Sequence, residues 1–192
     1  IKENITQSVF ESHDKAIKLG YIPINKLEKD TEYQINGQNY VLKKFRTFLI
    51  NTSKYPKSKS NSYLDIYKDE LILVSAHGIF SHSKIKNFEN EIQKLDVISS
   101  NIKDLVEYRD FYLHTEFGIK DILIVDDKIY VSYVNKKKLN DTDCYNTSIM
   151  VAEINFDRLE FEIFFDTNEC LGEESLGAHN SGGRMVKYDN KI

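Results

Sequence analysis

The sequence predicts an all-β protein and, within that class, a fragment of a β-propeller. Three observations carry this prediction: strand-like runs dominate the chain, short acidic turns separate them, and one hairpin phrase recurs. The phrase spans 69–75, returns without a gap over 126–132 and begins again at 189–192, which gives offsets of 57 and 63 residues. A hairpin unit that recurs at a roughly fixed long period, with room for two further strands between copies, is typical of a propeller blade.

Each copy of the phrase predicts a β-hairpin. An acidic two-residue turn follows an apolar run, and these runs lie at 63–67, 121–125 and 184–188. Such turns between alternating or continuous apolar runs favour antiparallel pairing of their flanks. We therefore expect residues 56–192 to form about two four-stranded blades and the start of a third, incomplete at the C-terminus.

The first part of the chain does not share the repeat, so we interpret residues 1–55 as an N-terminal extension with a helix and a hairpin. The segment Ser8-Val9-Phe10-Glu11 resembles a capping box, which predicts a helix over 9–19. Asn36-Gly37 separates two strand-like runs over 33–42, a pattern that favours a short hairpin.

Within the first blade, the apolar patterns predict strands over 62–68, 70–76, 78–85 and 93–99, and leave 101–114 open between helix and loop. In the second blade they predict strands over 119–125, 128–134, 147–154 and 159–166.

The last two predicted strands also suggest a disulfide. Odd positions are apolar over 159–166, and Ile149 and Val151 are the matching odd positions on the partner strand. Pairing them on one face favours a register in which paired residue numbers sum to 314, and Cys144 and Cys170 fit the same register. The alternative is two unpaired thiols. A disulfide would imply an oxidising compartment, so that the protein would be periplasmic or secreted.

Composition excludes two classes of partner. The net charge is −4, and the 26 basic residues are scattered rather than gathered into a stripe, which argues against binding to nucleic acid. No apolar run approaches the roughly 18 residues of a membrane helix, so we expect no membrane span. The chain opens on Ile1 and stops within its third repeat, and we interpret it as a fragment.

The strongest candidate for chemistry lies over 178–186. Paired glycines at Gly182 and Gly183 allow the backbone to approach another group closely, because no Cβ intervenes. Arg184 offers a planar donor fork for carboxylate or carbonyl groups, and His179 can serve as a base near neutral pH. At the start of an inner propeller strand, these groups would lie at the central channel.

This segment resembles the His-x-Gly-Gly-Arg element of the soluble quinoprotein glucose dehydrogenases and their sorbosone dehydrogenase relatives. The run over 118–124 is similarly placed to a Gly-Leu-Leu-Gly run of that family, so the resemblance covers roughly 62–192. It implies a six-bladed propeller that oxidises a sugar or another alcohol with pyrroloquinoline quinone (PQQ), with calcium bound by loops outside this chain. Counted back from Arg184 without a gap, the family's histidine falls on Asn180; His179 takes its place if Ser181 is an insertion.

The resemblance implies roles for the individual residues of this element. His179 is the expected catalytic base, and Asn180, Gly182, Gly183 and Arg184 are the expected cofactor-binding residues.

Two other readings stay open. A noncatalytic propeller would bind a carbohydrate or protein partner at its channel face and would bury Arg184 between blades. A hydrolytic propeller of the lactonase type would need a carboxylate and metal constellation, which the sequence does not present. His77 and His82 are five residues apart, which on a strand places them on opposite faces and argues against a shared metal.

Overall fold

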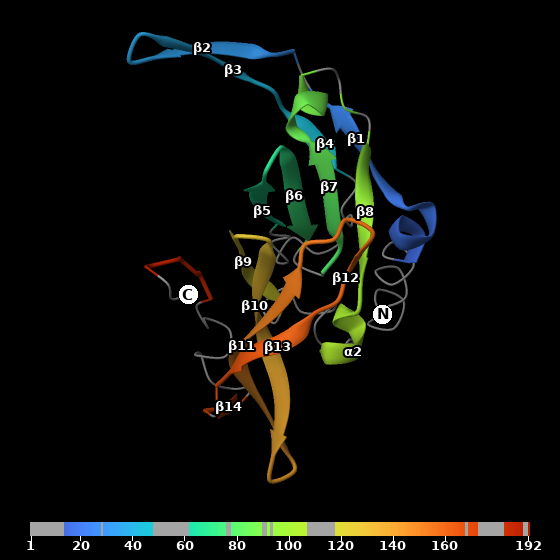
Figure 1. Ribbon diagram of the computed structural model, residues 1–192, viewed down its shortest axis with the longest axis vertical. Helices are drawn as coiled ribbons and strands as arrows, with labels where there is room; N and C mark the ends of the chain where they lie inside the picture. The colour runs from blue at the N-terminus through green and yellow to red at the C-terminus, as the bar shows by residue number, and fades with distance from the viewer. Residues whose placement is uncertain are drawn as a thin grey trace.

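The computed structural model describes residues 14–27, 29–47, 62–75, 78–89, 92, 94–106, 118–167, 169–172, 183–189 and 192. These residues are mostly β-strand with a few short helical turns, and no sheet closes on itself. The all-β class predicted from the sequence is therefore confirmed. Two large antiparallel sheets account for most of the described chain (Figure 1).

Sheet 1 is built around four consecutive antiparallel strands. They are β5 (Ser62–Tyr67), β6 (Glu70–Ser75), β7 (Phe80–Lys84) and β8 (Lys94–Ser100). Each strand pairs with the next along the chain. On the far edge of β8 the sheet continues through β1 (Tyr21–Lys26) and β4 (Phe45–Thr47). The N-terminal part of the chain thus adds strands to the first predicted blade.

Sheet 2 repeats the same antiparallel order. Its strands are β9 (Ile119–Val125), β10 (Lys128–Leu139), β11 (Thr142–Glu153) and β13 (Glu162–Asp166). The short β14 (Leu171–Gly172) pairs with β11 beyond the end of β13. The sequence therefore located every strand of the two predicted four-stranded units, although β10 and β11 extend five residues further at their shared turn than predicted.

Short elements flank the sheets. A helical segment covers 14–19, inside the helix predicted over 9–19, whose first residues lie outside the described part of the chain. The other helical turns are η2 (Ile85–Phe88) and α2 (Ile102–Leu105). The predicted Asn-Gly hairpin is β2 (Thr31–Ile35) and β3 (Gln38–Leu42), which projects from the end of sheet 1 (Figure 1).

The hairpin turns recur as predicted, but with a small correction in register. Lys68, Asp126 and Asp189 each adopt a positive φ, at 57°, 55° and 52°. The first two turns are Lys68-Asp69 and Asp126-Asp127, because Tyr67 pairs with Glu70 and Val125 with Lys128. Structurally equivalent residues in the two hairpins are therefore 58 apart, not 57, since Glu70 is already the first residue of its strand.

The core lies between the two sheets. Ile72, Val74 and Phe80 of sheet 1 pack in one cluster with residues of sheet 2 that include Val131 and Met150. A second cluster on the opposite face of sheet 1 joins β1, β8 and the helical segment over 14–19; its buried members are Ile22, Ile24, Ile79, Ile92 and Leu95. Sheet 1 is thus covered by apolar groups on both faces, whereas sheet 2 buries mainly one.

The strand predicted over 159–166 is interrupted, which is a correction. Its first residue, Leu159, belongs instead to the short β12 (Arg158–Leu159), which pairs in parallel with β8 of sheet 1. The Asn101 side chain then forms two hydrogen bonds with the backbone of Phe161. Its Nδ2 donates to the Phe161 carbonyl at 3.0 Å, and its Oδ1 accepts from the Phe161 N–H at 2.7 Å. The Asn101 amide therefore replaces a strand partner at the point where the chain crosses between the sheets.

The odd-numbered residues of this segment were predicted to face the core, and this holds only up to Phe161, before β13 begins. Leu159 and Phe161 are buried, as the odd-position pattern predicted. A bulge then shifts the register between Ile149 and Met150 of β11, so Phe165 pairs with Ile149 on the face opposite the core. On β11 the core residues are even-numbered, including Met150, so the predicted odd parity was wrong there.

Candidate functional site

The glycine–arginine segment lies beside β9, at the end where that strand begins. Ser132 Oγ donates to the Gly183 carbonyl, and the Met185 N–H donates to Asp121 Oδ2 at 2.8 Å. Side chains of β9 and β10 therefore hold the backbone of this segment against sheet 2. We call Lys120, Asp121, Ser132, Gly183 and Arg184 the strand-end site.

Gly183 has no side chain because sheet 2 occupies that space. A Cβ built on Gly183 would lie 2.5 Å from the Cβ of Lys120 and 3.0 Å from Ser132 Oγ. Real Cβ atoms do not approach each other this closely, and the Lys120 Cβ cannot move without its backbone. The close approach that the glycine permits is thus made to this chain's own strand.

Arg184 follows this anchored glycine with its side chain exposed to solvent. Among the described residues none forms an ion pair with it, and its guanidinium faces solvent beside the strand-end site. A guanidinium fork binds carboxylates and other planar oxyanions through two parallel hydrogen bonds. The site can therefore hold an anionic group, provided that the group reaches this end of the sheet.

The other residues predicted for the site lie outside the described part of the chain. These are His179, Asn180 and Gly182; His77 also lies outside it. Among the described residues, no group of three or more His, Cys, Asp or Glu side chains could hold a metal ion. Of the five residues predicted for the site, the structure thus places Gly183 and Arg184 together.

Sequence reasoning missed two aspartates that connect successive segments. Asp65 Oδ2 on β5 accepts the Ile124 N–H of β9 at 2.9 Å, and Asp121 on β9 accepts the Met185 N–H. Each carboxylate accepts a hydrogen bond from a backbone N–H that would otherwise need the carbonyl of a neighbouring strand. The available signal was a charged residue inside an apolar run, at Asp65 in 63–67 and at Asp121 in 121–125.

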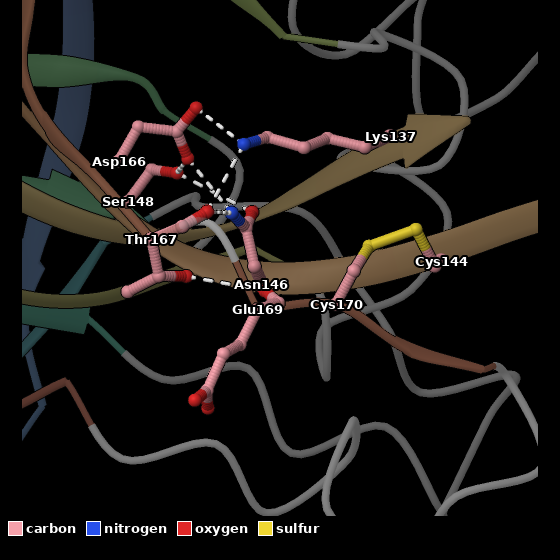
Figure 2. Close-up of a disulfide and its surroundings, with 8 residues drawn as sticks. All are labelled: Lys137, Cys144, Asn146, Ser148, Asp166, Thr167, Glu169 and Cys170. Carbon is pink, nitrogen blue, oxygen red and sulfur yellow. Dashed lines mark hydrogen bonds and ion pairs between the residues drawn. A yellow bond between two sulfur atoms is a disulfide. The ribbon is translucent and has the colours of Figure 1, made fainter. Parts of the chain in front are cut away.

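The predicted disulfide is present between Cys144 and Cys170, with a Cα–Cα distance of 5.4 Å (Figure 2). The register that sums to 314 holds nearby, at Ser148 with Asp166 and at Ile149 with Phe165. At the cysteines themselves, Cys144 pairs with Gly172, so the disulfide joins β11 to the chain just before β14. The alternative of two free thiols is excluded for this structure.

A polar network surrounds Asp166 beside the disulfide (Figure 2). Asp166 accepts hydrogen bonds from Ser148 Oγ at 2.6 Å and Asn146 Nδ2 at 2.8 Å, and pairs with Lys137 Nζ. Burial alone would raise the pKa of Asp166, but the hydrogen bonds from Lys137, Ser148 and Asn146 outweigh it and lower that pKa. Because these groups satisfy one another, the network stabilises the end of β13.

Tyr133 lies next to this network on the core face of β10. It is fully buried, and burial raises the pKa of its hydroxyl to about 12, with the negative charge of Asp166 adding to the shift. A neutral tyrosine in this position contributes to the core rather than acting as a base at neutral pH.

A histidine–carboxylate pair lies at the opposite end of the interface between the sheets. His82 Nδ1 is 3.0 Å from Glu70 Oε2, and the His82 ring stacks on Phe156 of sheet 2's connecting loop with ring centroids 4.4 Å apart. Both side chains of the pair are largely buried. This pair braces the two sheets and stands apart from the strand-end site.

Comparisons with known proteins add little. No protein-family model matches the chain, and the comparison with curated proteins finds no significant match. Among solved structures, a chain of an S. cerevisiae complex of Dbp5 with Nup159, Gle1, IP6 and ADP matches with a TM-score of 0.35 and 11% identity. The match covers 71% of this chain and 36% of that chain, well under two thirds of its length. A likeness at this TM-score supports no conclusion about fold or function.

The described residues contain no helix that is both long and apolar enough to cross a membrane.

Proposed function

We propose that sheets 1 and 2 are successive blades of a β-propeller that resembles the PQQ-dependent sugar dehydrogenases. The observation that carries the proposal is that two aspartates, at different positions of their strands, each hold a segment that follows later in the chain. Asp65 joins β5 of sheet 1 to β9 of sheet 2, and Asp121 joins β9 to the segment over 183–188. Three segments thus follow one another in the order that inner strands take around a propeller axis.

The proposed activity is oxidation of a sugar or another alcohol at the strand-end site. Bound PQQ would supply the two-electron acceptor for this reaction. Arg184 fits such a group, because its exposed guanidinium can pair with the carboxylates that PQQ carries. Gly183 does not contribute an open cradle, since Lys120 and Ser132 already fill the space beside it.

The remaining roles are proposed from the resemblance. His179 would accept the hydroxyl proton of the substrate as a general base. Asn180 and Gly182 would lie beside the cofactor, and calcium would be held by residues outside this chain. The disulfide is compatible with the periplasmic or secreted location that this class of enzyme would require.

A noncatalytic propeller that binds a carbohydrate or protein partner is the second candidate. The packing of Gly183 favours it, because this glycine has a sufficient structural reason without any cofactor. A noncatalytic propeller was expected to bury Arg184 between adjacent blades, and the exposure of Arg184 counts against that role for the arginine. An exposed arginine can equally contact an anionic sugar or protein group.

Dye-linked oxidation by the full-length protein, with added PQQ and calcium, tests the proposal. We expect turnover on at least one member of a panel of sugars and alcohols, and a much lower rate with Arg184→Ala. The matched control is Arg158→Ala. Arg158 is an exposed arginine of β12 that pairs with Glu160, and its removal should leave the oxidation rate unchanged. Absence of both turnover and PQQ binding would favour the noncatalytic propeller.

A further inference from the structure

The hairpin formed by β2 and β3 stands apart from the two large sheets. It projects from the end of sheet 1, and no other strand of the described chain pairs with either of its edges (Figure 1). A two-stranded hairpin alone is at best marginally stable in water, whereas three or more strands with an apolar face can be stable on their own. The hairpin therefore gains stability from a molecule that adds strands to it.

One face of this hairpin is apolar and exposed. Tyr33 pairs directly with Tyr40, and Ile35 and Leu42 lie on the same face because side chains alternate along each strand. These four side chains are between 43% and 56% exposed. Gln38 lies on this face too, and its Oε1 accepts a hydrogen bond from the Tyr40 hydroxyl at 2.7 Å. Apolar side chains gathered on one face of a projecting element indicate an interaction surface.

The outer edge of β3 is open to pairing with another chain. Its sequence, Gln38–Leu42, contains no charged residue, no proline and no glycine. Exposed edge strands commonly carry a charge or a proline that opposes pairing with a foreign strand. The other described edge strands of three or more residues each contain a charged residue: Glu32 in β2, Arg46 in β4, Asp65 in β5, Asp121 in β9 and Glu162 in β13.

The turn of the hairpin determines which backbone groups face this edge. With a two-residue turn at Asn36-Gly37, Tyr33 and Tyr40 form a hydrogen-bonded pair, since bonded and non-bonded pairs alternate along an antiparallel ladder. The backbone N–H and C=O groups of Asn39 and Val41 therefore point to the outer edge of β3. A strand that docks there must present N–H and C=O groups at the same two-residue spacing.

We propose that two copies of this chain form a dimer by antiparallel pairing of their β3 strands, with Tyr40 on the two-fold axis. In this register Asn39 lies opposite Val41 of the second copy, so the outward groups of each copy are the partners of the other. Gln38 lies opposite Leu42 of the second copy. All five residues of β3 are then paired, and no charged side chain lies opposite another.

A second copy fits this edge better than an unrelated strand, because it supplies what the hairpin lacks. The two hairpins become one four-stranded sheet whose apolar face continues across the axis, from Tyr33 and Tyr40 of one copy to those of the other. The edge that remains exposed is β2, which carries Glu32. A two-fold contact uses the same edge of both copies, so assembly ends at the dimer.

Sedimentation velocity of the full-length protein, over protein concentrations from about 1 µM to about 500 µM, tests the inference. The paired segment is short, so the interface lies at the low end of the size range of specific protein interfaces. We therefore expect a reversible equilibrium between monomer and dimer, with a dissociation constant on the order of micromolar.

Two matched variants locate the contact. Tyr40→Lys places two positive charges directly opposite each other at the axis, and should raise the dissociation constant of the dimer at least about fivefold. The control is Tyr33→Lys. Tyr33 has the same exposure of 48% and lies on the same face, and its loss breaks the same cross-strand pair within the hairpin. Because Tyr33 lies on β2, away from the axis, this control should change the dissociation constant less than about twofold.

Two outcomes would overturn the inference. A protein that remains monomeric over the whole concentration range would show that the β3 edge does not pair with a second copy. Equal effects of Tyr40→Lys and Tyr33→Lys on a dimer would assign the contact to another surface, such as the apolar face itself. The inference depends on neither the propeller nor its chemistry, so a dimer in a protein without dehydrogenase activity would still support it.

Discussion

At the scale of single residues, the most informative positions are those whose side chain, or lack of one, serves the neighbouring segment. Gly183 leaves room for the Lys120 side chain. Asp65 and Asp121 each accept a hydrogen bond from a backbone amide of the next segment. Asn101 takes the place of a strand partner for Phe161. Gly183 and Arg184 could be selected from the sequence because a glycine pair followed by an arginine allows close backbone approach beside a planar donor. The roles of the two aspartates and Asn101 could not be predicted in this way, because their partners lie about 60 residues away and the contacts arise only on folding.

Replacing Gly183 by alanine should destabilise the protein by about 1–3 kcal/mol, because the new Cβ would overlap the Lys120 Cβ. Urea unfolding measures the change. The neighbouring Arg184→Ala should stay within about 0.5 kcal/mol of the wild type, as expected for an exposed side chain. Equal stability of Gly183→Ala and the wild type would contradict the packing described for the strand-end site.

Asp166 should make stability depend on pH in the acid range. Its pKa in the folded protein is lowered from the ordinary aspartate value of 3.8, so its ionised form stabilises the fold above that value. The contribution is lost as the pH falls through the folded pKa. Asp166→Asn should therefore cost about 1 kcal/mol near pH 6 and progressively less below pH about 4. Urea unfolding across this range measures the gap, and a gap that does not narrow would refute the assignment.

At the scale of elements, the sequence predicted strand positions well and side-chain facing less well. Hairpins are local, so Asn36-Gly37 and the turns at Lys68 and Asp126 can be read from residue type. The facing of β13 depends on a bulge opposite Ile149, which no pattern in the strand itself reveals. The disulfide was nevertheless predicted, because the proposed register holds at the nearby pairs of β11 and β13.

Loss of the disulfide should destabilise the protein without abolishing the fold. The loop between Cys144 and Cys170 spans 26 residues, for which the chain-entropy model gives about 3.5 kcal/mol. Lys137 and Asn146 would still hold the Thr167 carbonyl and the end of β13. A Cys144→Ser/Cys170→Ser variant should therefore keep its far-ultraviolet circular dichroism and unfold at lower urea concentration. A random-coil spectrum in the absence of urea would show that the network around Asp166 does not suffice.

At the scale of the whole molecule, we expect the two sheets to unfold as one cooperative unit, because they share a core and several polar contacts. Residues of both sheets belong to the main apolar cluster, and Asp65, Tyr67 and His82 each reach across to sheet 2. Burial of this shared apolar surface provides most of the coupling. Hydrogen bonds such as that of Asp65 fix the relative position of the first strands.

Replacing Asp65 by alanine should test this coupling. The Ile124 N–H would lose its acceptor in a partly buried position, which costs about 1–3 kcal/mol. The matched control is Asp96→Ala, which removes an exposed carboxylate paired with Lys94 and should cost about 0–1 kcal/mol. Urea unfolding followed by two probes, one in each sheet, measures both stability and cooperativity. Equal stability of the two variants would show that Asp65 does not join the sheets.

The sequence by itself determined the all-β class, the two four-stranded units, their hairpin turns and the cysteine pair, because these features depend on residue type and on spacing along the strand. Only the tertiary structure decided which faces of the strands are buried, why Gly183 is a glycine, and which aspartates hold the next segment. These properties depend on groups distant in sequence that meet only when sheet packs on sheet. The same reason applies to Phe164 and Phe165, which lie beside the register shift between β11 and β13 and are half-exposed.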